Sequence, residues 1–177
     1  MNTKLNLDFY LKDALVVAPE LLGKILCRKI SDGKILRARI TQTEIYRGQE
    51  DTACHARFGK TNRSKIMYEQ GGIAYVYMIY GLHFLLNVVT GKKNFPQAVL
   101  IRAAENFNGP AKLTKALQID KNLNGESFTK NKIWIESDNY IVDYETAPRV
   151  GIDYADEFYK NIQWRFILKN NHLNKKS

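Results

Sequence analysis

The sequence predicts an α+β fold: a single compact domain in which a mostly antiparallel sheet carries a few flanking helices. The chain has 177 residues, which is enough for one well-buried domain and short for two. Stretches whose apolar pattern fits strands outnumber those that fit helices. Two neighbouring pairs of strands are separated by tight-turn residues, as in antiparallel hairpins. No linker or repeat divides the chain, so one domain is expected over residues 1–177.

The expected helices are short. Proline is tolerated in the first helical turn, so Pro19 and Pro110 mark the starts of two of them. The predicted helices span residues 8–15, 18–22, 66–69 and a segment that begins at 108–110. The predicted strands span residues 24–30, 35–46, 75–79, 82–89, 98–104, 132–136, 140–144 and 164–168. Residues 170–177 form a polar, basic tail that is expected to fray.

The stretch from Tyr75 to Asn87 is predicted to form a hairpin. It has no Lys, Arg, Asp or Glu, and Gly81 breaks its run of aromatic and aliphatic residues. Glycine tolerates the positive φ of hairpin turns, so the tip is expected at Tyr80-Gly81, with the Tyr80 ring exposed. Two interpretations stay open: the tyrosines are core residues, as aromatics in strands usually are, or some belong to a binding site.

Two charged residues lie in strands that are otherwise apolar. Side chains alternate along a strand, which places Glu44 on the face that begins with Leu36 and Ile40. Its carboxylate is expected either in water at the sheet edge or at the mouth of a site. Arg102 lies within the apolar strand over residues 98–104. An arginine there usually pairs with a carboxylate or faces a cleft.

The charge balance favours a polyanionic partner. Lys plus Arg is 27 and Asp plus Glu is 18, a net charge of +9. Without a strongly amphipathic basic helix, nucleic acid is favoured over an anionic membrane surface. A basic protein with no such partner remains the alternative. The long polar connection over residues 47–65 either contacts phosphates or is a solvated loop. Its second part carries four cations with no acid between them: Arg57, Lys60, Arg63 and Lys65.

The composition argues against several other classes of protein. No apolar run approaches the ~18 residues of a membrane-spanning helix, and residues 1–7 do not resemble a secretory signal. We expect a cytoplasmic protein, associated with the nucleoid through DNA, or a nuclear one, and not a secreted protein. The two cysteines and three histidines are too few for a disulfide framework, an iron–sulfur cluster or a good zinc site. We therefore expect no metal and no cofactor.

Together these residues suggest an enzyme that acts on nucleic acid. An exposed Tyr80 can fill the gap that a base leaves when it is turned out of the stack. Glu44 can act as a general base on a water held between it and His55. Tyr46 and Tyr77 can sandwich a planar ligand, and the faces of their rings favour a cationic one.

A series of motifs supports this interpretation. They are Thr43-Glu44-Ile45-Tyr46, Gly48-x-Glu50-Asp51-x-Ala53-x-His55, Gly59-Lys60-Thr61-x-Arg63, Gly72-x-Ala74-Tyr75-Val76-Tyr77-x-Ile79-Tyr80-Gly81, Asn87, Val99-Leu100-Ile101-Arg102-Ala103, Gly109-Pro110-x-Lys112-Leu113, Pro148-Arg149-x-Gly151-Ile152 and Trp164-Arg165-Phe166. In order and spacing they resemble the alkyladenine (3-methyladenine) DNA glycosylase family over nearly the whole chain. The family pattern differs at Gln49, Cys54 and Gln163, which bear on loop rigidity and oxidation rather than on the reaction.

The resemblance implies a curved sheet with a hairpin that inserts into DNA, and a monomer that acts on double-stranded DNA. It implies a monofunctional DNA glycosylase of base excision repair. Such an enzyme flips alkylated purines, such as 3-methyladenine and 7-methylguanine, out of the duplex and hydrolyses the N-glycosidic bond. The implied catalytic residues are Glu44, which activates water, with His55 and Arg102, which position it. The implied base pocket is Tyr46, His55, Tyr77 and Asn87, and the implied intercalating residue is Tyr80.

Two other functions stay open. One is a non-catalytic nucleic-acid-binding module that uses the basic loop and the tyrosines as a stacking platform. The other is a bifunctional glycosylase with a lysine nucleophile that forms a Schiff base. No lysine in the matched pocket motifs occupies the place of a nucleophile, so this second alternative is the weaker one. The sequence does not determine which lesions are preferred.

Overall fold

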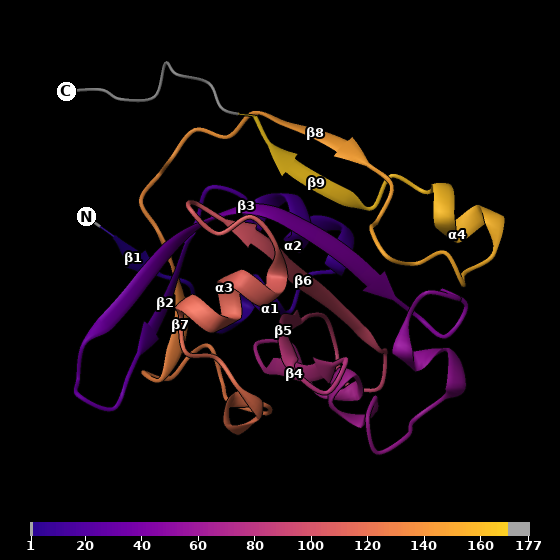
Figure 1. Cartoon of the computed structure of the whole chain (residues 1–177), viewed down its shortest axis with the longest axis horizontal. Helices are drawn as coiled ribbons and strands as arrows, with labels where there is room; N and C mark the ends of the chain where they lie inside the picture. The colour runs from indigo at the N-terminus through magenta and orange to yellow at the C-terminus, as the bar shows by residue number, and fades with distance from the viewer. Residues whose placement is uncertain (1, 170–177) are drawn as a thin grey trace.

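Nine antiparallel strands form one curled sheet in the computed structural model, which describes residues 2–169 (Figure 1). The main path runs β1-β7-β2-β3-β6-β5-β4, and β9 joins β8 to β3. The strands are β1 Thr3–Lys4, β2 Ile25–Lys29, β3 Ile35–Arg47, β4 Ala74–Ile79, β5 His83–Val89, β6 Gln97–Ala104, β7 Ile133–Ser137, β8 Tyr144–Ala147 and β9 Arg165–Leu168. The predicted α+β class, with one compact domain and a mostly antiparallel curved sheet, is confirmed for this part of the chain. The tail at 170–177 lies outside the described residues.

Strand β3 holds the two halves of the sheet together. Its first half pairs with β2, and its second half lies between β6 and β9. A β-bulge lies between Ile40 and Thr43, where the register with β6 shifts twice, and the alternation of side chains along β3 reverses there. Thr43 and Ile45 therefore follow Ile40 on the core face, and Glu44 lies on the other face. The prediction that Glu44 continues the face of Leu36 and Ile40 is wrong for this reason.

The helices are short, and side chains cap the amino-terminal ends of α1, α2 and α4. They are α1 Leu7–Tyr10, α2 Ala14–Leu21, α3 Pro110–Ala116 and α4 Glu157–Asn161, with 3-10 turns η1 His55–Phe58, η2 Lys65–Tyr68 and η3 Lys121–Leu123. The single helix predicted over 8–15 is two, because the Asn6 side chain caps α1 and the Asp13 carboxylate caps α2. The predicted start of the second helix at 18 is also wrong, since Pro19 lies inside α2. Pro110 does begin α3, as predicted.

The main core lies between the sheet and the helices. Its largest fully buried side chains include Tyr10, Leu21, Ile40, Ile101 and Phe128. A smaller cluster lies beneath the 48–68 segment and includes Cys54, Met67, Tyr68 and Tyr75. This second cluster ties the long polar connection to the sheet, so the connection is a packed part of the domain.

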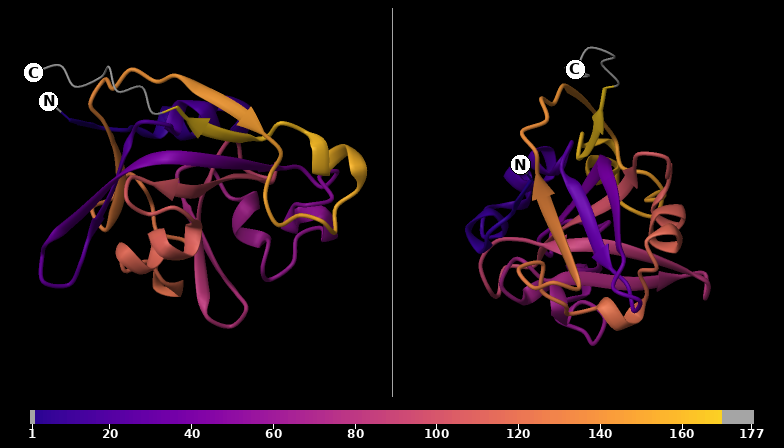
Figure 2. Two further views of the ribbon diagram at one scale, coloured as in Figure 1. Left: turned by 45° about the horizontal axis from the view of Figure 1, so that its top comes forward. Right: turned by 90° about the vertical axis from the view of Figure 1, so that its left-hand side faces the viewer.

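The hairpin of β4 and β5 forms where it is predicted and extends away from the body of the domain (Figure 2). The Leu82 N–H donates to the Ile79 carbonyl at 3.1 Å and closes the turn. Tyr80 and Gly81 have φ values of 51° and 65°, and two positive φ values in succession are typical of tight hairpin turns. The Tyr80 side chain is left in solvent, with 92% of the residue exposed.

The carboxy-terminal part differs most from the predictions. The strand predicted over 140–144 is wrong: β8 begins at Tyr144, where it meets β9. Tyr140 and Val142 pack on the main core as part of a connection and do not pair with a strand there. Helix α4 is not predicted, because its amphipathic pattern is only five residues long. No helix within residues 2–169 has the length and apolar character needed to cross a bilayer.

Candidate active site

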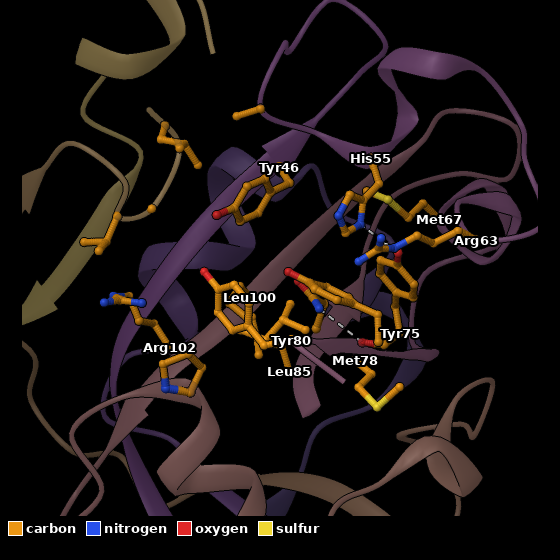
Figure 3. Close-up of a pocket in the computed structure, with 18 of the residues that line it drawn as sticks. Tyr46, His55, Arg63, Met67, Tyr75, Met78, Tyr80, Leu85, Leu100 and Arg102 are labelled. Carbon is orange, nitrogen blue, oxygen red and sulfur yellow. Dashed lines mark hydrogen bonds between the residues drawn. The ribbon is translucent and has the colours of Figure 1, made fainter. Parts of the chain in front are cut away.

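A cavity of about 510 Å³ opens on the face of the sheet opposite the main core (Figure 3). Its floor comes from adjacent strands, because residues directly opposite one another in a ladder point to the same side. The register that aligns them is Tyr75 with Asn87, Asn87 with Leu100 and Leu100 with Glu44. One wall comes from η1 and the basic loop, and another from residues 150–154.

Glu44 lies directly behind the cavity wall. Its side chain is fully buried, and the three residues that contact its carboxylate all line the cavity. Oε1 accepts the Val150 N–H at 3.1 Å and lies 3.2 Å from Arg102 Nε. Oε2 accepts the Tyr46 hydroxyl at 2.9 Å. The carboxylate is thus neither in water at the sheet edge nor at the mouth, as the two sequence-based alternatives expected. Arg102 both pairs with a carboxylate and faces the cleft.

Burial dominates the protonation of Glu44. It raises the pKa of the carboxyl, while Arg102, the Val150 N–H and the Tyr46 hydroxyl act in the opposite direction. Burial also raises the pKa of Tyr46 well above its usual value, so this hydroxyl stays protonated and donates. Two hydrogen-bond donors and one guanidinium therefore converge on a single buried carboxylate.

The two tyrosines predicted to sandwich a ligand both line the cavity. A guanidinium already lies over a face of each ring: Arg149 is 4.8 Å from the Tyr46 centroid, and Arg63 is 5.2 Å from that of Tyr77. These contacts fix the orientations of the rings. They also show that protein cations already make cation–π contacts with these rings, whereas the sequence analysis expects such contacts only from a cationic ligand.

His55 lies at the other side of the cavity from Arg102 (Figure 3). Its Nδ1 is 2.8 Å from the Tyr75 hydroxyl, and its ring meets the edge of Tyr77 at 4.7 Å. Burial lowers the pKa of His55 to about 4, helped by Arg63 and Arg57, so the imidazole is neutral at neutral pH. The Nδ1 contact is thus to Tyr75, and the prediction that His55 and Glu44 hold a water between them stays a prediction.

Asn87 is fixed in the cavity floor. Its Nδ2 donates to the Tyr75 carbonyl at 3.1 Å, and the residue is almost fully buried. Because this hydrogen bond holds the Asn87 amide in place, the side chain cannot easily move aside for a bulky substituent on a ligand. At the opposite end, the exposed Tyr80 reaches the rim of the cavity.

The four loop cations have different surroundings. Arg63, Lys60 and Lys65 are all exposed, and of these three Arg63 lines the cavity. Arg57 donates to the Thr52 carbonyl at 2.8 Å and lies between the rings of Phe58 and Tyr154. The loop itself is firmly held. Gln49 Nε2 donates to the Tyr68 hydroxyl at 2.9 Å, and Cys54 Sγ accepts the Ala56 N–H at the start of η1. Burial raises the pKa of the Cys54 thiol to about 12, so it stays protonated.

Sequence reasoning missed the residues that complete the site. Val150 reaches Glu44 through its backbone, which no side-chain pattern reveals. Asp51 and Arg149 form a fully buried ion pair behind Tyr46. Both stand in the matched motifs, which is the only signal that marks them. No three His, Cys, Asp or Glu side chains gather into a possible metal site anywhere in the described part of the chain.

This arrangement can hold a planar ring between tyrosines and present a carboxylate to a water at its edge. The cavity volume is within the usual range for small-molecule sites. The floor is rigid because it is built on paired strands, and the walls come from loops. Net positive charge around the mouth suits an anionic polymer that carries the ring.

Comparison with known proteins agrees with this geometry. The family model for methylpurine-DNA glycosylase matches residues 8–108 and 104–172. A relative from Desulfitobacterium hafniense is 43% identical over 94% of this chain and 96% of its own length. One from Borrelia garinii is 46% identical over 92% of this chain and 95% of its own. Both carry a provisional assignment as 3-methyladenine DNA glycosylases. The chain belongs to the methylpurine-DNA glycosylase family, a family of DNA repair enzymes that hydrolyse N-glycosyl bonds.

Proposed function

We propose that this DNA glycosylase is monofunctional and removes alkylated purines, such as 3-methyladenine and 7-methylguanine, from double-stranded DNA. The observation that carries the proposal is the buried Glu44 carboxylate, held by two hydrogen bonds and the Arg102 ion pair against a tyrosine-lined cavity. The names of the relatives support the same substrate class. We expect the enzyme to act as a monomer without a cofactor.

Glu44 is the general base. A carboxylate offers about four acceptor positions, and the hydrogen bonds from the Tyr46 hydroxyl to Oε2 and from the Val150 N–H to Oε1 leave a position free on Oε2. A water bound there gives its proton to Glu44 as its oxygen attacks C1′ of the sugar. The electron pair of the C1′–N bond leaves with the base and neutralises the positive charge of an alkylated purine. One carboxylate acting on water fits direct displacement better than a covalent intermediate.

The other groups position the reactants. Arg102 orients the carboxylate and the water beside it. Neutral His55 lines the base pocket with Tyr46 and Tyr77. It helps to position the water as part of the pocket wall. Asn87 crowds the exocyclic amine of normal guanine, so selection is partly steric.

The hairpin and the basic loop bind the duplex. Tyr80 enters the gap that the flipped nucleotide leaves, since its ring is free and lies at the cavity rim. The cations Arg57, Lys60, Arg63 and Lys65 bind phosphates along the strand. Through these contacts the enzyme is associated with DNA in the cell.

Release of free base from duplex DNA with one alkylated purine tests the proposal. We expect Glu44→Gln to lose release by about 10²–10⁴-fold while it keeps DNA binding. Glu145→Gln, an exposed glutamate on β8, is the matched control and should behave as the wild type. Equal release by Glu44→Gln and the wild type would contradict Glu44 as the base.

The same assay separates the alternatives. A wild type that binds the duplex but releases no base from any lesion would favour the non-catalytic binding module. Trapping of the protein on DNA by borohydride would instead favour a lysine nucleophile.

A further inference from the structure

A buried ion pair lies behind the active site. The Asp51 and Arg149 side chains are both fully buried and meet in a two-pronged contact, with Nη1 to Oδ2 at 2.7 Å and Nη2 to Oδ1 at 2.8 Å. The Asp51 carboxylate also accepts the backbone N–H groups of Arg47 and Ala53. Such a pair is costly to bury and, by itself, is weak evidence for a role in stability.

The pair joins the end of β3 and the loop that follows it to a turn that lies 98 residues after Asp51. Asp51 belongs to the loop that leads to His55, and Arg149 to the turn after β8. Arg149 Nη1 donates to the Ile45 carbonyl at 2.8 Å, next to Glu44 on β3. The guanidinium is also stacked between Tyr46 and Trp164, at 4.8 and 5.3 Å from the ring centroids.

The residue that follows Arg149 is one of the three that contact the Glu44 carboxylate. Val150 donates its N–H to Glu44 Oε1, and its side chain lines the cavity. Two adjacent residues thus bond to two adjacent residues of β3: Arg149 to Ile45 and Val150 to Glu44. The position of one bond fixes that of the other.

We propose that Asp51 and Arg149 are positioning residues for Glu44, which act by holding the Val150 N–H and the Tyr46 ring against it. This rests on the proposed function, because it assigns the pair to the same reaction. Asp51 places the guanidinium, and the guanidinium places the turn and the tyrosine. Neither residue touches the substrate.

Several other charged or titratable groups face Glu44 and must keep their places in any test. Arg102 on β6 and Tyr46 on β3 contact the carboxylate. Tyr77 on β4 lies within electrostatic range. Arg165 on β9 is opposite Glu44 in the ladder and donates to the Pro148 carbonyl at 3.0 Å, so it supports the same turn.

The chain offers a control pair with the same contact geometry, although its side chains are partly exposed. Arg39 and Asp138 make the same two-pronged contact, at 2.6 and 3.1 Å. Arg39 also donates to a carbonyl, that of Gly23, and lies over the Tyr140 ring at 4.4 Å. This pair joins β3 to the segment after β7 and contacts none of the cavity residues.

The test compares Asp51→Asn/Arg149→Gln with Arg39→Gln/Asp138→Asn. Removing both charges together avoids leaving one buried and unpaired. Single-turnover release from an alkylated duplex is measured across pH, together with binding to a duplex that contains an abasic-site analogue. We expect the Asp51/Arg149 variant to lose about tenfold to a hundredfold in rate, the value of a hydrogen bond to a charged group. Its acidic limb should move to higher pH, because the carboxylate loses a donor. Binding to the analogue should change little.

The control variant should keep the wild-type rate and pH profile, even if its thermal midpoint falls as much as that of the Asp51/Arg149 variant. Arg149→Lys keeps the charge and so the fold, but one ammonium cannot hold Asp51, the Ile45 carbonyl and two rings together, so an intermediate rate is expected. If the Asp51/Arg149 variant matches the control pair in rate and pH profile while the wild type and Glu44→Gln behave as proposed, the inference is wrong and the proposed function stands. A wild type that releases no base overturns both.

Discussion

The substitution Tyr80→Ala tests whether Tyr80 contributes to the stability of the fold or to DNA binding. The ring is 92% exposed, so of roughly 200 Å² in a tyrosine side chain only about 16 Å² is buried, worth about 0.4 kcal/mol. The free energy of unfolding should therefore change by less than about 0.5 kcal/mol. Alanine suits the φ of 51° no worse than tyrosine does, since both carry a Cβ.

The same substitution should strongly reduce base flipping. Stacking of an aromatic side chain on a base is worth about 1–3 kcal/mol, which corresponds to a loss of roughly 5- to 150-fold in the flipped population. Thermal unfolding measures the first effect, and single-turnover release from an alkylated duplex measures the second. A fluorescent base analogue at the lesion position reports flipping directly.

Two comparisons make the result decisive. Phe158→Ala removes another exposed ring, on α4, and should leave both stability and release unchanged. The defect of Tyr80→Ala should shrink when the lesion lies in single-stranded DNA, where less stacking must be broken. If Tyr80→Ala unfolds the domain, or flips bases as well as the wild type does, Tyr80 is a structural residue and not the intercalating one.

Three further results follow from the protonation of the site. Tyr46→Phe removes the donor to Glu44 Oε2 and should raise the pKa of that carboxyl, moving the acidic limb of the rate–pH profile to higher pH; an unmoved limb would argue against Glu44 as the titrating base. Arg63→Gln should raise the pKa of His55 above its value of about 4, measured by NMR titration of the ring, while Lys65→Gln should leave it unchanged. Burial raises the pKa of Glu44 in the folded state above the unfolded value, so the folded protein loses stability as pH rises through that interval. Glu44→Gln lacks this pH-dependent loss of stability, so its thermal midpoint relative to that of the wild type should rise with pH. A difference in thermal midpoint that does not change with pH would count against the raised pKa.

The sequence predicts local features of the fold well. Gly81 locates the hairpin tip, and both φ values there are positive as the turn requires. Pro110 marks the start of α3, and the antiparallel pairs follow from the short turns. These features depend on residues that are neighbours in the chain, and their conformational preferences act in any context.

The site is less accessible to prediction because it depends on contacts between distant segments. Simple alternation puts Glu44 on the core face, and only the bulge after Ile40 reverses it. Nothing in the residues at 41 and 42 announces a bulge, since its position is set by the pairing with β6 and β9. The Val150 donor is a backbone group 106 residues away from Glu44.

The three groups that contact the Glu44 carboxylate come from separate elements of the fold, which couples the proposed base to the whole domain. Tyr46 follows on β3, Arg102 lies on β6, and Val150 lies in the turn after β8. A buried carboxylate without donors would be strongly disfavoured in its charged form. Inside the folded domain the charged form of this carboxylate therefore depends on groups that the sheet, the bulge and the turn bring together. Opening of the 148–152 turn alone would expose the carboxylate to water and remove one donor, so local loosening there should lower activity before it unfolds the domain.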